Sequence, residues 1–312
     1  MDKEKRKAEV SKSRETPVFM NIKTDFGFKK IFGNKVLLIA FLNAILNRDI
    51  VEVEYLPAEQ LGYIEENRRA VYDVYCTTAT GERFIVEMQA SPQVHFADRI
   101  VFYMSYPVLS QAPRGQRSLI NSAGKELKVP WDYSLSGVYM ICILDSIMFS
   151  EEKAKNIVLE HMKIVRQNAD TVLTDKWEAV TVELPKFKKT EDELETVTDK
   201  WIYSLKNMEK LPERPEKLNE KIFDELYENA KINRLKTEDM KAYSKSILEY
   251  DDVISSLRFV EERTRRETRE ETRKEERVEF VRNCHKYNMD IERIAALTGL
   301  TEKEVSDVIA KL

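Results

Sequence analysis

Residues 71–76 read VYDVYC and residues 83–89 read RFIVEMQ, and these segments decide the fold prediction because each is an apolar β-strand pattern interrupted by one acid. Both are rich in β-branched and aromatic residues, and residues 77–81 between them, TTATG, are typical of a hairpin loop that ends in glycine. In an antiparallel pair of strands, the residue numbers of two opposed residues always add up to the same total. A turn centred in this loop therefore places Asp73 directly across from Glu87.

The hairpin also brings a third polar side chain to this position. Opposed Cβ atoms in such a pair lie ~5 Å apart. Since side chains alternate along a strand, Glu87 and Gln89 share a face with Ile85. We expect Asp73, Glu87 and Gln89 to converge on one spot.

Two carboxylates this close repel each other, and a shared proton, a basic partner or a divalent cation relieves the repulsion. Mg²⁺ fits this set best, because it binds oxygen ligands and commonly uses one or two carboxylates with substrate phosphates, while the Gln89 amide and the Met88 carbonyl add neutral oxygens. The alternative is structural: Asp73 lies near a strand end, and Glu87 pairs with Arg83 or a lysine on a solvated face. Spacing alone favours neither interpretation.

The composition is that of a globular protein that also carries highly charged segments. The 312 residues suffice for one large or two ordinary domains, and 42% hydrophobic content is enough for a core. The longest apolar run, residues 138–144, is far too short for a membrane span, and the charged N-terminus has no apolar segment for secretion. We expect a cytoplasmic protein without a membrane partner. The three cysteines have no CxxC spacing and predict neither a disulfide framework nor a zinc site.

The net charge of −4 means that binding to nucleic acid has to depend on local basic patches. One patch is the lysine- and arginine-rich stretch of residues 1–35. A second is a loop that contains Arg114, Arg117, Lys125 and Lys128. Each patch could hold phosphates, or could simply be solvated.

The remaining pattern predicts an α/β or α+β core followed by helices. Residues 1–16 are charged and expected to be disordered. The expected core elements are a helix from Thr24 to Gly33, a helix from Leu37 to about Asn47, a strand over 50–55, the hairpin, a helix over 94–106 that Pro107 interrupts, a buried central strand over 137–144, a strand over 178–184 and helices beyond 191.

The C-terminal part is predicted to form separate helices. Residues 251–280 are expected to be a charged helix or linker, since they have almost nothing to bury. Residues 281–312 resemble a small helix-turn-helix, with an apolar face that includes Leu297, a turn at Gly299 and a capping box that starts at Thr301. The exposed face of the last helix is net acidic, so self-association or partner docking is favoured over base recognition.

Several of these features together resemble one protein family. They are residues 24–33 (TDFGFKKIFG), Asp73, residues 87–89 (EMQ) and the buried strand that ends in Leu144 and Asp145. They are similar to the Rpn family of recombination-promoting nucleases, also described as PD-(D/E)XK nuclease family transposases, over about residues 17–250. The resemblance implies a restriction-endonuclease-like fold, a mixed β-sheet flanked by helices. It also implies Mg²⁺- or Mn²⁺-dependent DNA endonuclease activity, linked to recombination, transposition or defence against mobile elements.

The resemblance also assigns roles at the site. Asp73 and Glu87 match the two acids that bind the metal, and Gln89 stands where the wider superfamily has a lysine. A neutral amide can orient water but adds no positive charge, which Lys29 or Lys30 could supply instead. Asp25 is a further candidate ligand, although its place at a helix N-terminus explains it as well.

Contacts to the DNA backbone are expected from two places. Arg99 and Tyr103 lie one helical turn apart just after the strand that carries Glu87, and Arg114 and Arg117 lie in the basic loop. The alternative to an enzyme is a catalytically inactive nuclease fold that serves as a nucleic-acid-binding or regulatory module, because fold alone does not establish activity.

Overall fold

The computed structural model divides into two compact units, the first ending at Asp251 and the second beginning at Asp252. The described segments of the chain are residues 17–60, 70–112, 116–120 and 124–311. The predicted disordered tail, residues 1–16, lies outside them.

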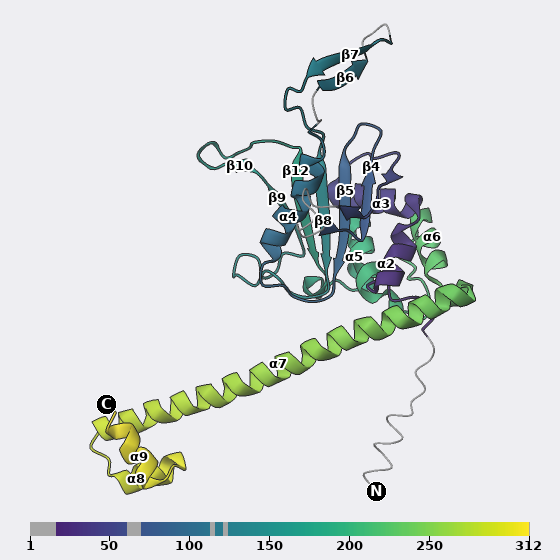
Figure 1. Ribbon diagram of the computed structural model, residues 1–312. Helices are drawn as coiled ribbons and strands as arrows, with labels where there is room; N and C mark the ends of the chain where they lie inside the picture. Colours follow the sequence, from purple (N-terminus) through teal and green to yellow (C-terminus); the bar gives the residue numbers. More distant parts are fainter. Residues whose placement is uncertain (1–16, 61–69, 113–115, 121–123, 312) are drawn as a thin grey trace. The chain divides into compact units, whose positions relative to one another are not determined.

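A six-stranded mixed β-sheet forms the centre of the first unit (Figure 1). Its strands lie in the order β1 (Glu54–Tyr55), β4 (Val74–Thr77), β5 (Arg83–Gln89), β8 (Val138–Leu144), β12 (Trp177–Glu183) and β9 (Leu159–Lys163). Strands β5, β8 and β12 run parallel, and the other neighbours are antiparallel. Two-stranded ribbons are formed by β2 (Glu59–Gln60) with β3 (Ala70–Val71), β6 (Gln116–Ile120) with β7 (Glu126–Pro130) and β10 (Val165–Arg166) with β11 (Thr171–Val172).

Helices cover both faces of the sheet, which is why every residue of β8 is buried. In the first unit they are α2 (Asp25–Phe32), α3 (Lys35–Leu46), α4 (Phe96–Leu109), α5 (Val197–Asn207), α6 (Lys221–Ala230) and the start of α7 (Thr237–Lys286). Short 3₁₀ turns lie at Gln167–Ala169, Leu184–Lys186, Glu191–Glu193, Met208–Lys210 and Ile232–Arg234. One core joins α2, α3, α5 and α6 to one face of the sheet, and a smaller core joins α4 to the other face. The predicted fold class, a mixed sheet flanked by helices with a helical C-terminal region, is confirmed.

The β4–β5 hairpin has the predicted register. Val74 pairs with Val86 and Thr77 with Arg83, so the same index sum places Asp73 opposite Glu87, one residue beyond the start of β4. Gly81 in the loop has φ +83°, a conformation that side chains with a Cβ disfavour. The loop glycine therefore fixes the turn that sets this register.

The TDFGFKKIFG stretch forms α2 as predicted. The Thr24 hydroxyl accepts a hydrogen bond from the Gly27 backbone N–H at 3.1 Å and caps the helix. A Cβ on Gly27 would lie 2.3 Å from the Asn21 carbonyl oxygen, so only glycine fits there. The start of α2 is thereby held close against the preceding segment.

The predicted strand over residues 50–55 is wrong for most of its length, because only Glu54–Tyr55 pair with β4. Asn43 explains the difference. Its side-chain amide donates to the Ile50 carbonyl at 2.9 Å, and its side-chain oxygen accepts from the Ile50 N–H at 2.8 Å. The backbone groups that a strand would use are therefore bound by the end of α3.

The predicted end of α4 before Pro107 is also wrong, since the helix runs through that proline to Leu109. Proline has no N–H to donate to the carbonyl four residues earlier, which is that of Tyr103. The Tyr72 hydroxyl donates to the Tyr103 carbonyl instead, at 2.8 Å. A side chain from beside the hairpin thus supplies the hydrogen bond that the proline removes.

The second unit contains the rest of α7 together with α8 (Ile291–Thr298) and α9 (Glu302–Ile309). Its core is small and consists of Val281, Cys284, Ile294 and Val305. Gly299 ends α8 at φ +68°, and Thr301 caps α9, as predicted. Leu297, predicted to belong to the apolar face of α8, is 59% exposed. Self-association through these helices stays a prediction.

Within the described residues, no helix has both the length and the apolar character needed to span a membrane.

Candidate active site

Asp73 and Glu87 each bind the backbone of the strand that carries the other. The Asp73 backbone N–H donates to Glu87 Oε1 at 3.0 Å, and the Met88 N–H donates to Asp73 Oδ2 at 2.8 Å. The two carboxylates therefore face each other beyond the last ladder pair of β4 and β5. Each keeps a second oxygen, Asp73 Oδ1 and Glu87 Oε2, for another partner.

Burial makes these two carboxyl groups unusually weak acids. The Glu87 side chain is only 7% exposed. Burial, with a contribution from the nearby Asp73 charge, raises the pKa of Glu87 to about 8. Burial also raises the pKa of Asp73, although the Met88 N–H and the Lys29 charge oppose it. The structural alternative of a solvated Glu87 is therefore wrong, and Arg83 is not its partner, since its guanidinium binds Pro107 O and Ser110.

Arg99 is the cation that pairs with Glu87. Its Nη2 lies 3.5 Å from Glu87 Oε2, and its guanidinium carbon lies 4.2 Å from the centre of the Tyr103 ring. Both residues belong to α4, whose buried face packs on the sheet. The spacing of one helical turn therefore places Arg99 and Tyr103 beside the carboxylates. Tyr103 itself is 9% exposed and part of the core.

Gln89 lies at the end of β5, two residues after Glu87. Its side-chain NH₂ donates to the Ser91 carbonyl at 3.2 Å. The side-chain oxygen of Gln89 has no hydrogen-bond partner among the described residues. With this amide orientation the oxygen, rather than the nitrogen, is the group that Gln89 can offer to a ligand.

The three charged α2 residues predicted for the site, Asp25, Lys29 and Lys30, have different partners. Asp25 and Lys29 form an exposed ion pair at 2.6 Å, and the charge of each shifts the pKa of Asp73, Lys29 downward and Asp25 upward. Both charges thus act on the site. Lys30 instead pairs with Asp239 of α7 at 2.8 Å and is not brought to the carboxylates.

Of the basic-loop residues, Arg114 lies outside the described residues, and Arg117 is described only through its backbone in β6. Their expected contacts to DNA stay predictions.

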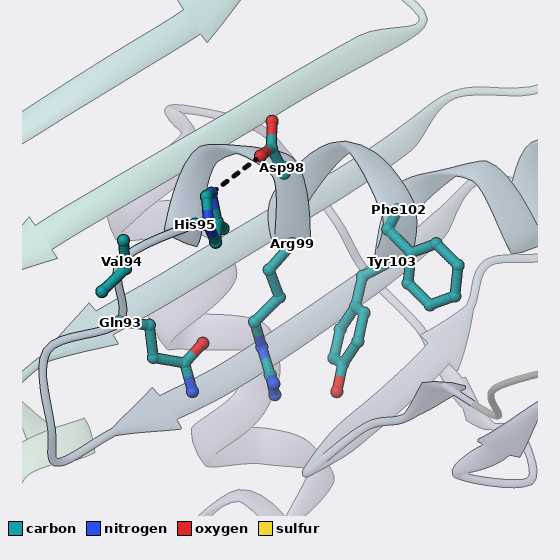
Figure 2. A pocket seen from close by; sticks show the side chains of 7 residues that line it. All are labelled: Gln93, Val94, His95, Asp98, Arg99, Phe102 and Tyr103. Atoms are coloured by element: carbon teal, nitrogen blue, oxygen red, sulfur yellow. Dashed lines mark ion pairs between the residues drawn. The ribbon is translucent and has the colours of Figure 1, made fainter.

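A cleft of about 500 Å³ opens along α4 beside Arg99. Figure 2 shows Arg99 and Tyr103 side by side on the same side of the helix, with Gln93 before them on the preceding loop. His95 and Asp98 pair with each other at 3.4 Å on another side of the helix. The residues that line the cleft are Gln93, Val94, His95, Asp98, Arg99, Phe102 and Tyr103.

Sequence reasoning missed a second polar cluster next to Gln89. The Asp145 backbone N–H donates to the Gln89 backbone carbonyl at 3.0 Å. The Asp145 carboxylate forms an ion pair with Lys23 at 3.0 Å and accepts a hydrogen bond from the Tyr250 hydroxyl. Asp145 was visible as the residue after the buried strand. Lys23 and Tyr250 had no signal, because only the fold brings residues this distant in sequence together.

The donor set can be tested against the cation that the sequence suggests. Two carboxylate oxygens and one amide oxygen, all hard ligands, fit Mg²⁺ or Mn²⁺. No group of three or more His, Cys, Asp or Glu side chains in the described part of the chain could hold a metal. A site with two carboxylates is compatible with that, because Mg²⁺ commonly keeps several waters. Arg99 would have to move from Glu87 Oε2 to free that oxygen.

Comparison with known proteins decides the family. The family model described as PD-(D/E)XK nuclease family transposase matches residues 22–260 of the 312-residue chain. The chain belongs to this family. The match includes α2, the hairpin with Asp73 and Glu87, and the whole central sheet, and the fold is consistent with a PD-(D/E)XK nuclease. Comparisons with curated proteins and with solved structures find no match.

Proposed function

We propose that this PD-(D/E)XK family member is an endonuclease that hydrolyses phosphodiester bonds in DNA with the help of Mg²⁺ or Mn²⁺, in recombination, transposition or defence against mobile elements. The observation that carries the proposal is the pair of buried carboxylates, Asp73 and Glu87, which face each other at the end of the hairpin. A fold does not need two buried acids there for stability alone, because their repulsion has to be offset.

The roles follow from the geometry. Asp73 Oδ1 and Glu87 Oε2 would hold the cation, and the Gln89 side-chain oxygen would orient the attacking water. A divalent cation bound there lowers the pKa of a water molecule and polarises a phosphoryl oxygen. The hydrogen bonds that fix Asp73 Oδ2 and Glu87 Oε1 keep the other two oxygens in place.

Because Gln89 stands where the superfamily has a lysine, another residue has to supply the positive charge that faces the phosphate. Arg99 lies 3.5 Å from Glu87 and can donate several N–H groups in a plane, which suits a phosphate. We assign to it the role of binding the phosphate whose bond is cleaved, with Lys29 adding charge from α2. Lys30, bound to Asp239, is not part of this set.

Cleavage of a supercoiled plasmid with Mg²⁺ or Mn²⁺ tests the proposal. Asp73→Asn and Glu87→Gln keep the size of each side chain and an oxygen that can accept the backbone hydrogen bond, but remove the charge. We expect each to slow cleavage about 100-fold or more, which equals ~2.7 kcal/mol of transition-state stabilisation. Asp170→Asn, in the exposed β10–β11 turn, is the matched control and should leave the rate unchanged. Equal nicking by all four proteins would contradict the assignment.

The second candidate is a catalytically inactive nuclease fold that binds nucleic acid. Two observations favour it: Arg99 already lies against Glu87 Oε2, and Gln89 replaces the usual lysine. In that case DNA binds in EDTA, and neither Mg²⁺ nor Mn²⁺ produces cleavage.

A further inference from the structure

The cleft along α4 is a site that the proposed function does not use beyond Arg99. We propose that it binds one unpaired nucleotide of a DNA strand, with the base against Phe102 and the phosphate at Arg99, so that the substrate is single-stranded or locally unpaired at this position. The inference rests on the proposed function only in that the bound polymer is DNA.

Part of the wall of the cleft is apolar or aromatic although it is open to water. Phe102 is 39% exposed and Val94 is 95% exposed. The Phe102 ring is held by an edge-on contact with Tyr106, at 5.2 Å between ring centres. An exposed aromatic ring in a fixed orientation is the surface on which single-stranded nucleic acids stack their bases, and such stacking depends little on which base is bound.

Arg99 lines the same cleft and provides an anchor for phosphate. In the metal-free protein its side chain is 27% exposed, so a ligand can reach it while Glu87 and the Tyr103 ring hold it in place. A phosphate bound to Arg99 would lie beside the carboxylate pair. The cleft therefore places a base next to the phosphate that the site would attack.

The polar groups in the lining suit the edge of a base. The Gln93 side chain carries both a donor and an acceptor, and can therefore pair with different bases. Asp98, the acid in the lining, lies 3.4 Å from His95, on another side of the helix from Arg99. The lining thus combines the exposed ring of Phe102 with one amide and one accessible arginine.

The size of the cleft argues against a base within a double helix. A volume of about 500 Å³ is that of a small-molecule site. A paired base in a duplex has both faces covered by its neighbours, so it would have to leave the stack and lose its pairing to reach Phe102. An unpaired strand does not have this cost.

The test measures binding without catalysis. Fluorescence anisotropy in EDTA compares a single-stranded oligonucleotide with the duplex of the same sequence and with a free deoxynucleoside monophosphate. We expect the wild-type chain to bind the single strand more tightly than the duplex, and Phe102→Ala to weaken that binding about tenfold. Phe102→Trp keeps an aromatic face and should bind as the wild type does. Val101→Ala, at a 61% exposed position on the same helix outside the cleft, is the control.

A strand with 2-aminopurine reports directly on stacking. Its fluorescence should change when the wild type or Phe102→Trp binds, and this change should be reduced with Phe102→Ala. Equal binding of single strand and duplex, or an unchanged affinity and fluorescence in Phe102→Ala, would overturn the inference. The inference would also be overturned if the free monophosphate bound as tightly as the single strand and Phe102→Ala weakened its binding. That result would indicate a site for a mononucleotide. Failure of the proposed nuclease would be seen separately, as absent cleavage when Mg²⁺ or Mn²⁺ is added to the wild type.

Discussion

Asp73 and Glu87 have a structural task as well as a proposed chemical one. Each accepts a backbone N–H where the ladder between β4 and β5 has ended. A protonated carboxyl group can still accept that bond through its carbonyl oxygen, although less strongly than a carboxylate does, so the fold tolerates a proton on the pair. In the metal-free protein this proton would take the place of the proposed cation.

This leads to a prediction for the metal-free protein. The pKa of Glu87 is raised from 4.5 to about 8, so between these pH values the folded chain holds a proton that the unfolded chain releases. The contribution of Glu87 to the free energy of unfolding is therefore full below about pH 4.5 and is lost as the pH rises to about 8, by at most ~1.4 kcal/mol per pH unit.

Urea unfolding in EDTA at several pH values between 5 and 8 measures this slope. Glu87→Gln cannot titrate at this position, so its free energy of unfolding should depend less on pH than that of the wild type. An identical slope in both proteins would show that Glu87 titrates normally.

Part of the candidate site could be predicted from the sequence alone. The facing of Asp73 and Glu87 followed from strand alternation and the position of one loop, both local properties. The partner of Glu87 did not follow, because Arg99 comes from a helix that packs on the sheet through tertiary contacts. The cluster of Lys23, Asp145 and Tyr250 was hidden for the same reason.

At the scale of elements, α4 shows how a neighbouring segment can override a local signal. Pro107 predicts the end of a helix, and α4 continues because Tyr72 donates to the Tyr103 carbonyl, to which a proline cannot donate. The strand over residues 50–55 failed for a related reason, since Asn43 binds the backbone of Ile50. Helix caps and the hairpin register, which depend on residues close in sequence, were predicted correctly.

The Tyr72 hydrogen bond can be tested with a double-mutant cycle. Tyr72→Phe removes the donor to the buried Tyr103 carbonyl and should lower the free energy of unfolding by about 1–3 kcal/mol. Pro107→Ala restores a backbone N–H that can bond to the same carbonyl. In the Pro107→Ala background Tyr72→Phe should therefore cost clearly less. Chemical denaturation of the four proteins measures this, and equal costs in both backgrounds would contradict the explanation.

At the scale of the whole molecule, the start of α7 belongs to the first unit. The Asn21 N–H donates to the Tyr243 hydroxyl at 2.8 Å, the Phe26 N–H donates to the Ser246 hydroxyl at 3.0 Å, and the Tyr250 hydroxyl donates to Asp145. These bonds tie α7 to the segment before α2, to the first turn of α2 and to the residue after β8. The end of the first unit at Asp251 is consistent with them.

Two truncations separate this role of α7 from the rest of the helix. A chain that ends at Asp251 keeps all three hydrogen bonds and should melt within a few degrees of the full chain. A chain that ends at Lys236 loses them and should lose about 3 kcal/mol of stability, or ~6–12 °C in melting temperature. Differential scanning calorimetry measures both, and equal melting temperatures for the two truncated chains would contradict the assignment.

The most direct test of the account is the binding of a divalent cation to the carboxylate pair, measured by isothermal titration calorimetry with Mn²⁺ and Mg²⁺. We predict binding to the wild type that strengthens from pH 6 to pH 8, because the cation has to displace the proton held with a pKa of about 8. Asp73→Asn and Glu87→Gln should each abolish it, and Asp170→Asn should not. Undiminished binding in both site variants, or none to the wild type at pH 8, would contradict the central claim.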